Sequence, residues 1–97
     1  ANRGVNPVTK KKVFDAELTS KIVAMIASVG FYEHTGDWIF TSGIPAKTGV
    51  GGGIVGVLPG VMGIAAFSPK LDGSGNSVRA QNAIKYITNK LGLNLFG

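Results

Sequence analysis

A glycine-rich aliphatic run in the middle of the chain limits most strongly what these 97 residues can fold into. Residues 48–57 are almost all glycine or aliphatic and rich in β-branched side chains, which is typical of a strand buried on both faces. "LPGV" at 58–61 predicts a turn, and "MGIAAF" at 62–67 predicts the returning strand of a hairpin. Glycines and Pro59 interrupt the apolar stretch 50–66, so it does not provide the roughly 18 residues of a membrane span.

Apolar residues at helical spacing predict two longer helices that flank this hairpin. Asp15 is expected to cap the first helix, and Gly30 to end it as a C-terminal cap. Asn76 or Ser77 is expected to cap the second helix, which stops at Gly92. The first apolar stripe consists of Leu18, Ile22, Met25, Ile26 and Val29, and the second of Ala80, Ile84, Ile87 and Leu91.

A short helix is predicted over 35–41, with Thr35 as its N-cap and Gly43 beyond its end. The opening "ANRGVNPVT" predicts a loop. The stretch 68–76 also predicts a loop, in which Asp72 and "GSGNS" indicate turn and helix-cap chemistry. These elements define one structural unit of the α+β class, with helix, short helix, β-hairpin and C-terminal helix in that order.

The composition is unusually apolar for a free-standing soluble domain of this size. A length of 97 residues allows one domain at most, or a piece of a larger one. Hydrophobic residues make up 44% and the mean hydropathy is +0.25, which indicates that a partner surface is missing. The chain has no cysteine, which fits a reducing compartment and makes the cytoplasm the expected location. Its single histidine, His34, has no ligand cluster around it and is interpreted as a solvated loop residue, so neither a metal nor a cofactor is predicted.

The net charge of +5 raises the question of a nucleic-acid or membrane partner. Lys10, Lys11 and Lys12 cluster near the start, where a solvated turn explains them, and the other basic residues are spread along the chain without interleaved aromatic residues. No signal peptide is recognised at the start. Neither partner is therefore predicted. A nucleic-acid binder remains an open alternative that a steep salt dependence of DNA or RNA retention would indicate.

The stretch "GIPAKTGVGGGIVGVLPG" at 43–60 invites a phosphate-binding interpretation, which its spacing excludes. A P-loop needs glycines one and six residues before its lysine, and before Lys47 these positions hold Ala46 and Thr41. The G-x-G-x-x-G match at 51–56 does not lead from a strand into a helix, as a dinucleotide fingerprint must. Glycines in a strand more often allow a helix or a ligand to approach the backbone closely.

The triplet Lys47-Thr48-Gly49 at the head of the predicted strand has a second interpretation. K-T-G occurs in β-lactamases and penicillin-binding proteins, where it accompanies the serine of an S-x-x-K motif. There the lysine supplies a positive charge, the threonine a hydroxyl donor, and the glycine room for substrate along the strand, while the next N–H can point at a developing oxyanion. A surface Lys-Thr-Gly turn is the alternative.

The surrounding residues 30–80 favour the catalytic interpretation. They contain a Gly-Phe-Tyr-Glu turn, a short helix beginning Thr-Gly-Asp, "GIPAKTGVGGGI", a Leu-Pro turn, "SPKLD" and "GNSV". In these motifs the chain closely resembles the C-terminal part of the bacterial and mitochondrial serine-dependent glutaminases. The opening loop is similar as well, so the resemblance extends over nearly the whole chain and implies that residues 1–97 form the C-terminal part of a single glutaminase domain.

The resemblance implies a β-lactamase/transpeptidase-like fold, an antiparallel sheet packed with helices, and hydrolysis of L-glutamine to L-glutamate and ammonia through a serine acyl-enzyme. It places Tyr32 as a catalytic group that contacts substrate and assists proton transfer. It places Val50 as a residue whose backbone N–H donates to the oxyanion. Lys47, Thr48 and Gly49 would support the pocket. It also implies a homo-oligomer, either a dimer or a tetramer.

The serine of an S-x-x-K motif is not among these residues. The residues three positions after Ser20, Ser28, Ser42, Ser68, Ser74 and Ser77 are Val23, Phe31, Pro45, Leu71, Ser77 and Ala80. The resemblance therefore implies that the nucleophile lies in an upstream segment and that this chain carries half a site. A penicillin-interacting serine hydrolase, which a β-lactam would acylate, and a non-catalytic interaction module remain alternatives.

Overall fold

The computed structural model describes residues 2–97, so only Ala1 of the predicted opening loop lies outside the described residues. Three short 3-10 helices, η1 (Asn2–Gly4), η2 (Ala16–Leu18) and η3 (Tyr32–His34), accompany three α-helices in this part of the chain. The α-helices and strands are α1 (Thr19–Val29), α2 (Thr35–Ser42), β1 (Ala46–Thr48), β2 (Gly53–Leu58), β3 (Met62–Phe67) and α3 (Val78–Lys90). The predicted α+β class is confirmed.

The strands described form an antiparallel sheet in the order β1-β2-β3. The predicted hairpin is confirmed, since β2 pairs with β3 around the turn at 59–61. The prediction of one strand over 48–57 was wrong, because a turn at 49–52 divides the run into β1 and β2. Gly49 N–H donates to Gly53 C=O and Gly52 N–H to Gly49 C=O, both at 3.0 Å. Gly52 has a φ of 101°, a conformation that favours glycine, so the same glycines that suited a strand allow the chain to reverse.

The prediction that the strand is buried on both faces was also wrong, because only one face of the sheet meets the core. Ile54 and Leu58 of β2 are buried there, whereas Val55 between them is 58% exposed. Gly56 lies on the buried face, where a Cβ atom would come within 2.9 Å of Ile44 Cδ1. The core on this face consists of Phe31, Trp38, Ile44, Ala46, Ile54, Leu58, Ala80 and Ile84.

The first helix ends as predicted but for a different physical reason. Gly30 is its C-terminal cap, yet its φ of −69° is right-handed and any residue could adopt it. A Cβ atom at Gly30 would lie 1.8 Å from Ala46 C=O, so glycine is required for the close approach to β1. At the other end, the prediction of Asp15 as a capping side chain was wrong: it makes no capping hydrogen bond and instead forms an ion pair with Lys12.

The later helices follow the predictions in part. Ser77 is confirmed as the cap of α3, because its hydroxyl accepts from Ala80 N–H at 3.2 Å. Thr35 was wrongly predicted to cap the short helix, since it is the first helical residue of α2. The apolar stripe of α3 was half right, because Ala80 and Ile84 are buried whereas Ile87 and Leu91 are exposed.

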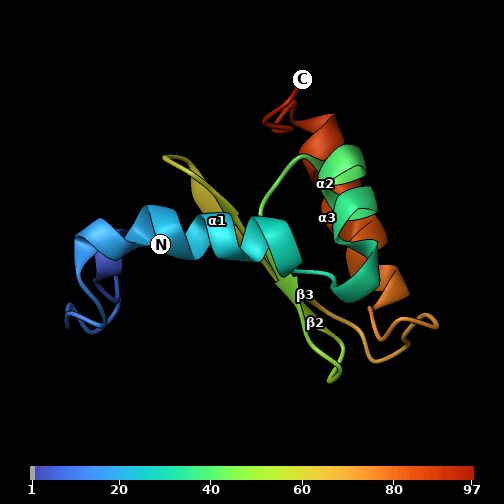
Figure 1. The fold of residues 1–97 in the computed structure, drawn as a ribbon, viewed down its shortest axis with the longest axis horizontal. Coiled ribbons are helices and arrows are strands. Elements are labelled where there is room, and N and C mark those ends of the chain that lie inside the picture. Colours follow the sequence, from blue (N-terminus) through green and yellow to red (C-terminus); the bar gives the residue numbers. More distant parts are fainter. Residues whose placement is uncertain (1) are drawn as a thin grey trace.

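The helices pack unequally on the sheet (Figure 1). α2 and α3 lie together beside it and supply Trp38, Ala80 and Ile84 to the core, whereas α1 crosses in front of the strands. None of the residues of α1 is buried. Leu18, Ile22, Met25 and Val29 of its predicted stripe are exposed, and so are Val55 and Phe67 on the outer face of the sheet. These residues account for part of the apolar surface that the composition indicated, and others such as Val8, Phe40 and Phe96 are exposed as well.

Candidate active site

Tyr32 begins η3, in the short connection between α1 and α2 where the sequence predicts a tight turn. The preceding residue, Phe31, is fully buried and stacks on Trp38 with ring centroids 4.2 Å apart. Tyr32 itself is 48% exposed and has a φ of 53°, in the left-handed region that a bulky residue rarely adopts. A buried neighbour thus anchors a strained turn from which the phenol ring projects toward solvent.

Lys47 is brought to this tyrosine by the sheet. It lies in β1 opposite Val55, on the face that does not meet the core. Its Nζ atom is 4.6 Å from the centroid of the Tyr32 ring, which is within cation–π range, and it donates to Thr48 C=O. The side chain of Thr48 points to the other face, where it is buried, and its hydroxyl has no hydrogen-bond partner within residues 2–97.

Val50 follows Gly49 in the turn between β1 and β2, with a side chain that is 70% exposed. Within the described residues its backbone N–H donates no hydrogen bond, whereas the N–H groups of Gly49 and Gly52 close the turn. A Cβ atom built on Gly75 would lie 3.6 Å from Val50 Cγ1 and 3.9 Å from Tyr32 Cε2. The turns that carry Tyr32, Val50 and Gly75 therefore meet at one place.

The loop that carries Gly75 is held in shape by Asp72. Its carboxylate accepts from the backbone N–H groups of Ser74 at 2.9 Å and Asn76 at 3.1 Å, and from the Gln81 amide at 3.2 Å. Burial alone would raise the pKa of Asp72, but these hydrogen bonds and the nearby charge of His34 together lower that pKa below its ordinary value. An ionised Asp72 thus holds the loop in shape.

Two contacts fasten this loop to the turn of Tyr32. The Ser74 hydroxyl donates to Glu33 Oε1 at 2.6 Å. The Asn76 amide donates to Phe31 C=O at 3.5 Å, and Asn76 is fully buried. Sequence reasoning assigned this loop to turn and cap chemistry alone and missed its contact with the candidate site. The "GNSV" motif was the available signal, because it placed the loop among the segments of the resemblance.

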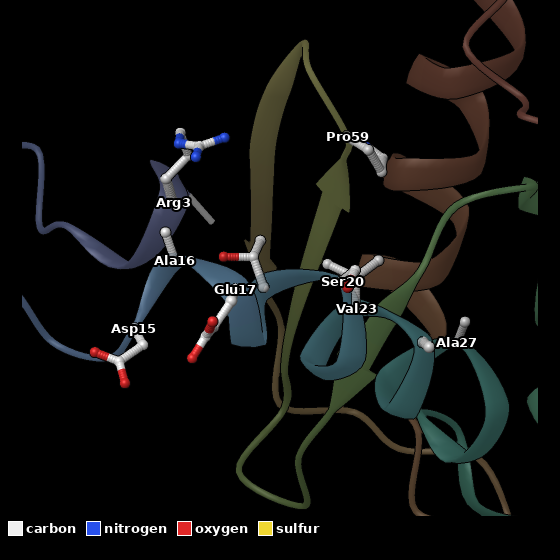
Figure 2. A pocket seen from close by; sticks show the side chains of 10 residues that line it. Arg3, Asp15, Ala16, Glu17, Ser20, Val23, Ala27 and Pro59 are labelled. Carbon is white, nitrogen blue, oxygen red and sulfur yellow. The ribbon is translucent and has the colours of Figure 1, made fainter.

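A wide hollow lies away from these residues (Figure 2). It has a volume of about 1070 Å³ and is bordered by the N-terminal segment, α1 and Pro59. Pro59 follows β2, whereas Val50 precedes it, so hollow and candidate site are at opposite ends of that strand. Neither Tyr32 nor Lys47 borders the hollow.

Within residues 2–97, no group of three or more His, Cys, Asp or Glu side chains could hold a metal ion. His34 is exposed, as predicted, and its Nδ1 lies 3.3 Å from Asp37 Oδ2. No helix in this range has the length and apolar character needed to cross a membrane.

Strand β1 and the turns of Tyr32 and Val50 bring together a lysine ammonium, an exposed phenol and a backbone N–H that has no partner within residues 2–97. Such a set can donate a proton or a hydrogen bond and stabilise negative charge on a reacting carbonyl oxygen. The described residues do not offer a serine paired with lysine at S-x-x-K spacing. The set therefore suits one part of an acyl-transfer site.

The fold and these motifs are those of the glutaminase family, and the chain belongs to it: the family model described as Glutaminase matches residues 1–96. A glutaminase of Bacteroides fragilis is 79% identical over 96 residues, which are 99% of this chain and 30% of that protein. Glutaminase 1 of Escherichia coli K12 is 52% identical over 96% of this chain and 30% of its own length.

A solved structure gives the same result at greater sequence distance. The glutaminase YbgJ of Bacillus subtilis, in covalent complex with 5-oxo-L-norleucine after reaction with 6-diazo-5-oxo-L-norleucine, superposes with a TM-score of 0.88 at 27% identity. The match covers 98% of this chain and 35% of that one. The chain thus spans about a third of the length of the relatives it matches.

Proposed function

We propose that residues 1–97 are the C-terminal part of a single glutaminase domain, which hydrolyses L-glutamine to L-glutamate and ammonia. The observation that carries the proposal is the meeting of Tyr32, from one motif of the family resemblance, with Lys47 and Val50, from another, around one exposed spot. The adduct on YbgJ supports glutamine as the substrate, because 5-oxo-L-norleucine has a carbonyl where glutamine has its side-chain amide carbonyl.

The reaction proceeds through a serine of a preceding segment. Its oxygen attacks the side-chain amide carbon of glutamine, a C–O bond forms, and the C–N bond then breaks as the nitrogen takes up a proton and leaves as ammonia. Water hydrolyses the resulting ester to L-glutamate and restores the serine. Because negative charge develops on the carbonyl oxygen in both halves, a donor placed at that oxygen accelerates both.

Tyr32, Lys47 and Val50 each have a role in this scheme. The N–H of Val50 donates to the carbonyl oxygen as its charge develops, and it is available because it donates to no group within residues 2–97. The hydroxyl of Tyr32 contacts substrate and passes a proton toward the leaving nitrogen. Lys47 supplies a positive charge 4.6 Å from the centre of the Tyr32 ring.

Thr48 and Gly49 support the pocket from within the sheet and the turn. The Thr48 hydroxyl is buried below the site, so its support acts through packing of β1 on the core. Gly49 opens the turn that presents Val50, and its N–H ties the turn to Gly53. Neither residue needs to touch substrate for the scheme to hold.

The wider assembly follows from the same proposal. The remainder of the domain completes a β-lactamase/transpeptidase-like fold and covers the exposed apolar residues of α1 and of the outer sheet face. The whole protein acts in the cytoplasm as a homo-oligomer, a dimer or a tetramer, without a cofactor and without nucleic acid or membrane as partners. The exposed apolar surface supports the need for a covering segment.

Ammonia release from L-glutamine by the purified full-length protein tests the proposal, with a β-lactam reporter as a parallel acylation assay. We expect release of glutamate and ammonia in equal amounts and no lasting acylation by the β-lactam. Residues 1–97 expressed alone should be inactive and poorly soluble, because nucleophile and cover are absent. Robust turnover by this fragment would contradict the half-site, and β-lactam acylation without glutamine hydrolysis would contradict the substrate.

A further inference from the structure

The backbone of Tyr32 is held in an unfavourable conformation, and the structure shows what holds it. A φ of 53° brings the Cβ atom of an L-residue close to its own backbone, so such a conformation persists only where neighbouring contacts determine it. A relaxed turn would aim the side chain elsewhere. The orientation of the ring toward Lys47 and Gly75 therefore depends on the contacts that maintain this φ angle.

The hydroxyl of Thr35 makes two hydrogen bonds that span the strained residue. It accepts from Phe31 N–H at 3.0 Å and donates to Tyr32 C=O at 2.7 Å. The two peptide groups lie on either side of the Phe31-Tyr32 unit, so one oxygen atom fixes the distance between them. Because the hydroxyl is both donor and acceptor, a methyl group of the same size cannot replace it.

Thr35 does not use this hydroxyl for its own helix. A threonine at the start of a helix ordinarily accepts from an N–H of the first turn. Thr35 is already helical, with φ −57° and ψ −43°, and α2 has no side-chain capping bond at this end. Both hydrogen bonds of the hydroxyl are instead made to the residues that precede the helix.

We propose that Thr35 is a positioning residue, whose hydroxyl holds Tyr32 in its left-handed conformation and so aims the phenol into the active site. The catalytic consequence rests on the function proposed above, whereas the conformational one does not. Thr35 acts on the reaction only through Tyr32. Its removal should therefore affect turnover strongly in an enzyme that has the Tyr32 hydroxyl and little in one that lacks it.

The test uses the full-length protein with Thr35→Val, which keeps the side-chain shape, and Thr35→Ser, which keeps the hydroxyl. Thr41→Val is the matched control, because Thr41 lies in the same helix and its hydroxyl donates to Asp37 C=O at 2.7 Å, away from the site. We expect Thr35→Val to lower kcat by about 10- to 100-fold, the range for a catalytic group misplaced by an ångström, with a smaller change in KM. Thr35→Ser and Thr41→Val should stay close to wild type.

Two measurements separate positioning from a general loss of structure. Thr35→Val is repeated in a Tyr32→Phe background, where we expect little further loss of turnover, because the group that Thr35 positions is gone. Crystal structures of the valine and serine variants give the φ angle of Tyr32 directly. We expect a negative φ, and a Tyr32 ring more than about 6 Å from Lys47 Nζ, in the valine variant alone.

The outcomes distinguish the two proposals. If wild-type protein does not hydrolyse glutamine, the proposed function fails, and the crystal structures still decide the conformational claim. Retention of the positive φ and of the Lys47 contact in Thr35→Val overturns the inference. Equal kcat in Thr35→Val and Thr41→Val overturns it too, and so does an equally large additional loss in the Tyr32→Phe background. Should Thr35→Val not fold, Thr35→Ala carries the same expectations.

Discussion

Replacing Val50 with proline in the full-length protein removes the backbone N–H proposed to donate to the oxyanion, because proline has no backbone N–H. The structure indicates that the substitution disturbs little else. Val50 lies in the turn at 49–52 and not in a strand, so no hydrogen bond of the sheet is lost. Its N–H donates to no group within residues 2–97, and the residue before it, Gly49, tolerates the restriction that proline imposes.

The expected effect is that of losing one oxyanion donor. Such a loss lowers kcat by about 100- to 1000-fold, or about 2.7–4 kcal/mol of transition-state stabilisation. Val50→Ala keeps the N–H and removes a side chain that is 70% exposed, so we expect it to be mild. The melting temperatures of both variants should stay near that of wild type, since neither change touches the core or the strand pairing.

Steady-state glutamine hydrolysis and thermal melting of the two variants, measured side by side, check this expectation. The informative result is a large difference in kcat at similar melting temperature. If proline and alanine reduce kcat equally, the backbone N–H has no special role and the side chain or the turn itself matters. If Val50→Pro retains normal kcat, the oxyanion donor has to be sought elsewhere.

Two further predictions concern the phenol and the loop beneath it. Tyr32→Phe should abolish most glutamine hydrolysis and leave the melting temperature nearly unchanged, because it removes one polar atom and keeps the ring against Lys47. Near-normal turnover with a lowered melting temperature would instead make Tyr32 a packing residue. Asp72 has a lowered pKa in the folded protein, so its ionised form contributes stability that is fully present above the unfolded pKa of about 3.9 and is lost as the pH falls through the folded value. Urea unfolding between pH 6 and pH 3 should therefore show that the difference in free energy of unfolding between wild type and Asp72→Asn shrinks as the pH falls. A difference that stays constant with pH would contradict this role.

The elements that sequence reasoning predicted correctly are those with local signals. The turn before β3 and the strand itself follow from "LPGV" and the residues after it, since proline restricts φ and glycine readily adopts the positive φ, 76° at Gly60, that such a turn uses. Ser77 caps α3 through its own hydroxyl, a contact within one turn of helix. Neither depends on a distant part of the chain, so a short window of sequence contains the whole cause.

The division of residues 46–58 into two strands had no such signal. Glycine is compatible with a strand and with a chain reversal. Four of the five residues at 49–53 are glycine, so the sequence there is compatible with either structure. The choice depends on pairing: Lys47 lies opposite Val55, and Thr48 opposite Ile54, only if the chain turns between them. Pairing is a tertiary property, which a pattern of residue types along one segment does not contain.

Gly30 shows the same limit in a single residue. At the end of an apolar helical stripe, a glycine indicates a left-handed cap, and that local explanation is sufficient for the sequence. The structure gives it a right-handed φ and a carbonyl oxygen of β1 where a side chain would begin. The requirement for glycine comes from a strand sixteen residues further along the chain, so the correct position was predicted from an incorrect cause.

The candidate site combines three segments, each of which is fully accounted for by itself. A glycine-aromatic turn before a helix, a Lys-Thr-Gly reversal and an Asp-Gly-Ser-Gly loop are ordinary turn chemistry. What makes them a candidate site is that the sheet brings Lys47 against the ring of Tyr32, and that Gly75, at a φ of 87°, lies next to both Tyr32 and Val50. A Cβ atom at Gly75 would be in ordinary van der Waals contact with both side chains, so the glycine itself is required by its positive φ, and the meeting of the three turns is visible only in the folded chain. The family resemblance could name Tyr32 and Val50 beforehand because it compares whole sites, whereas residue patterns could only weigh each turn separately.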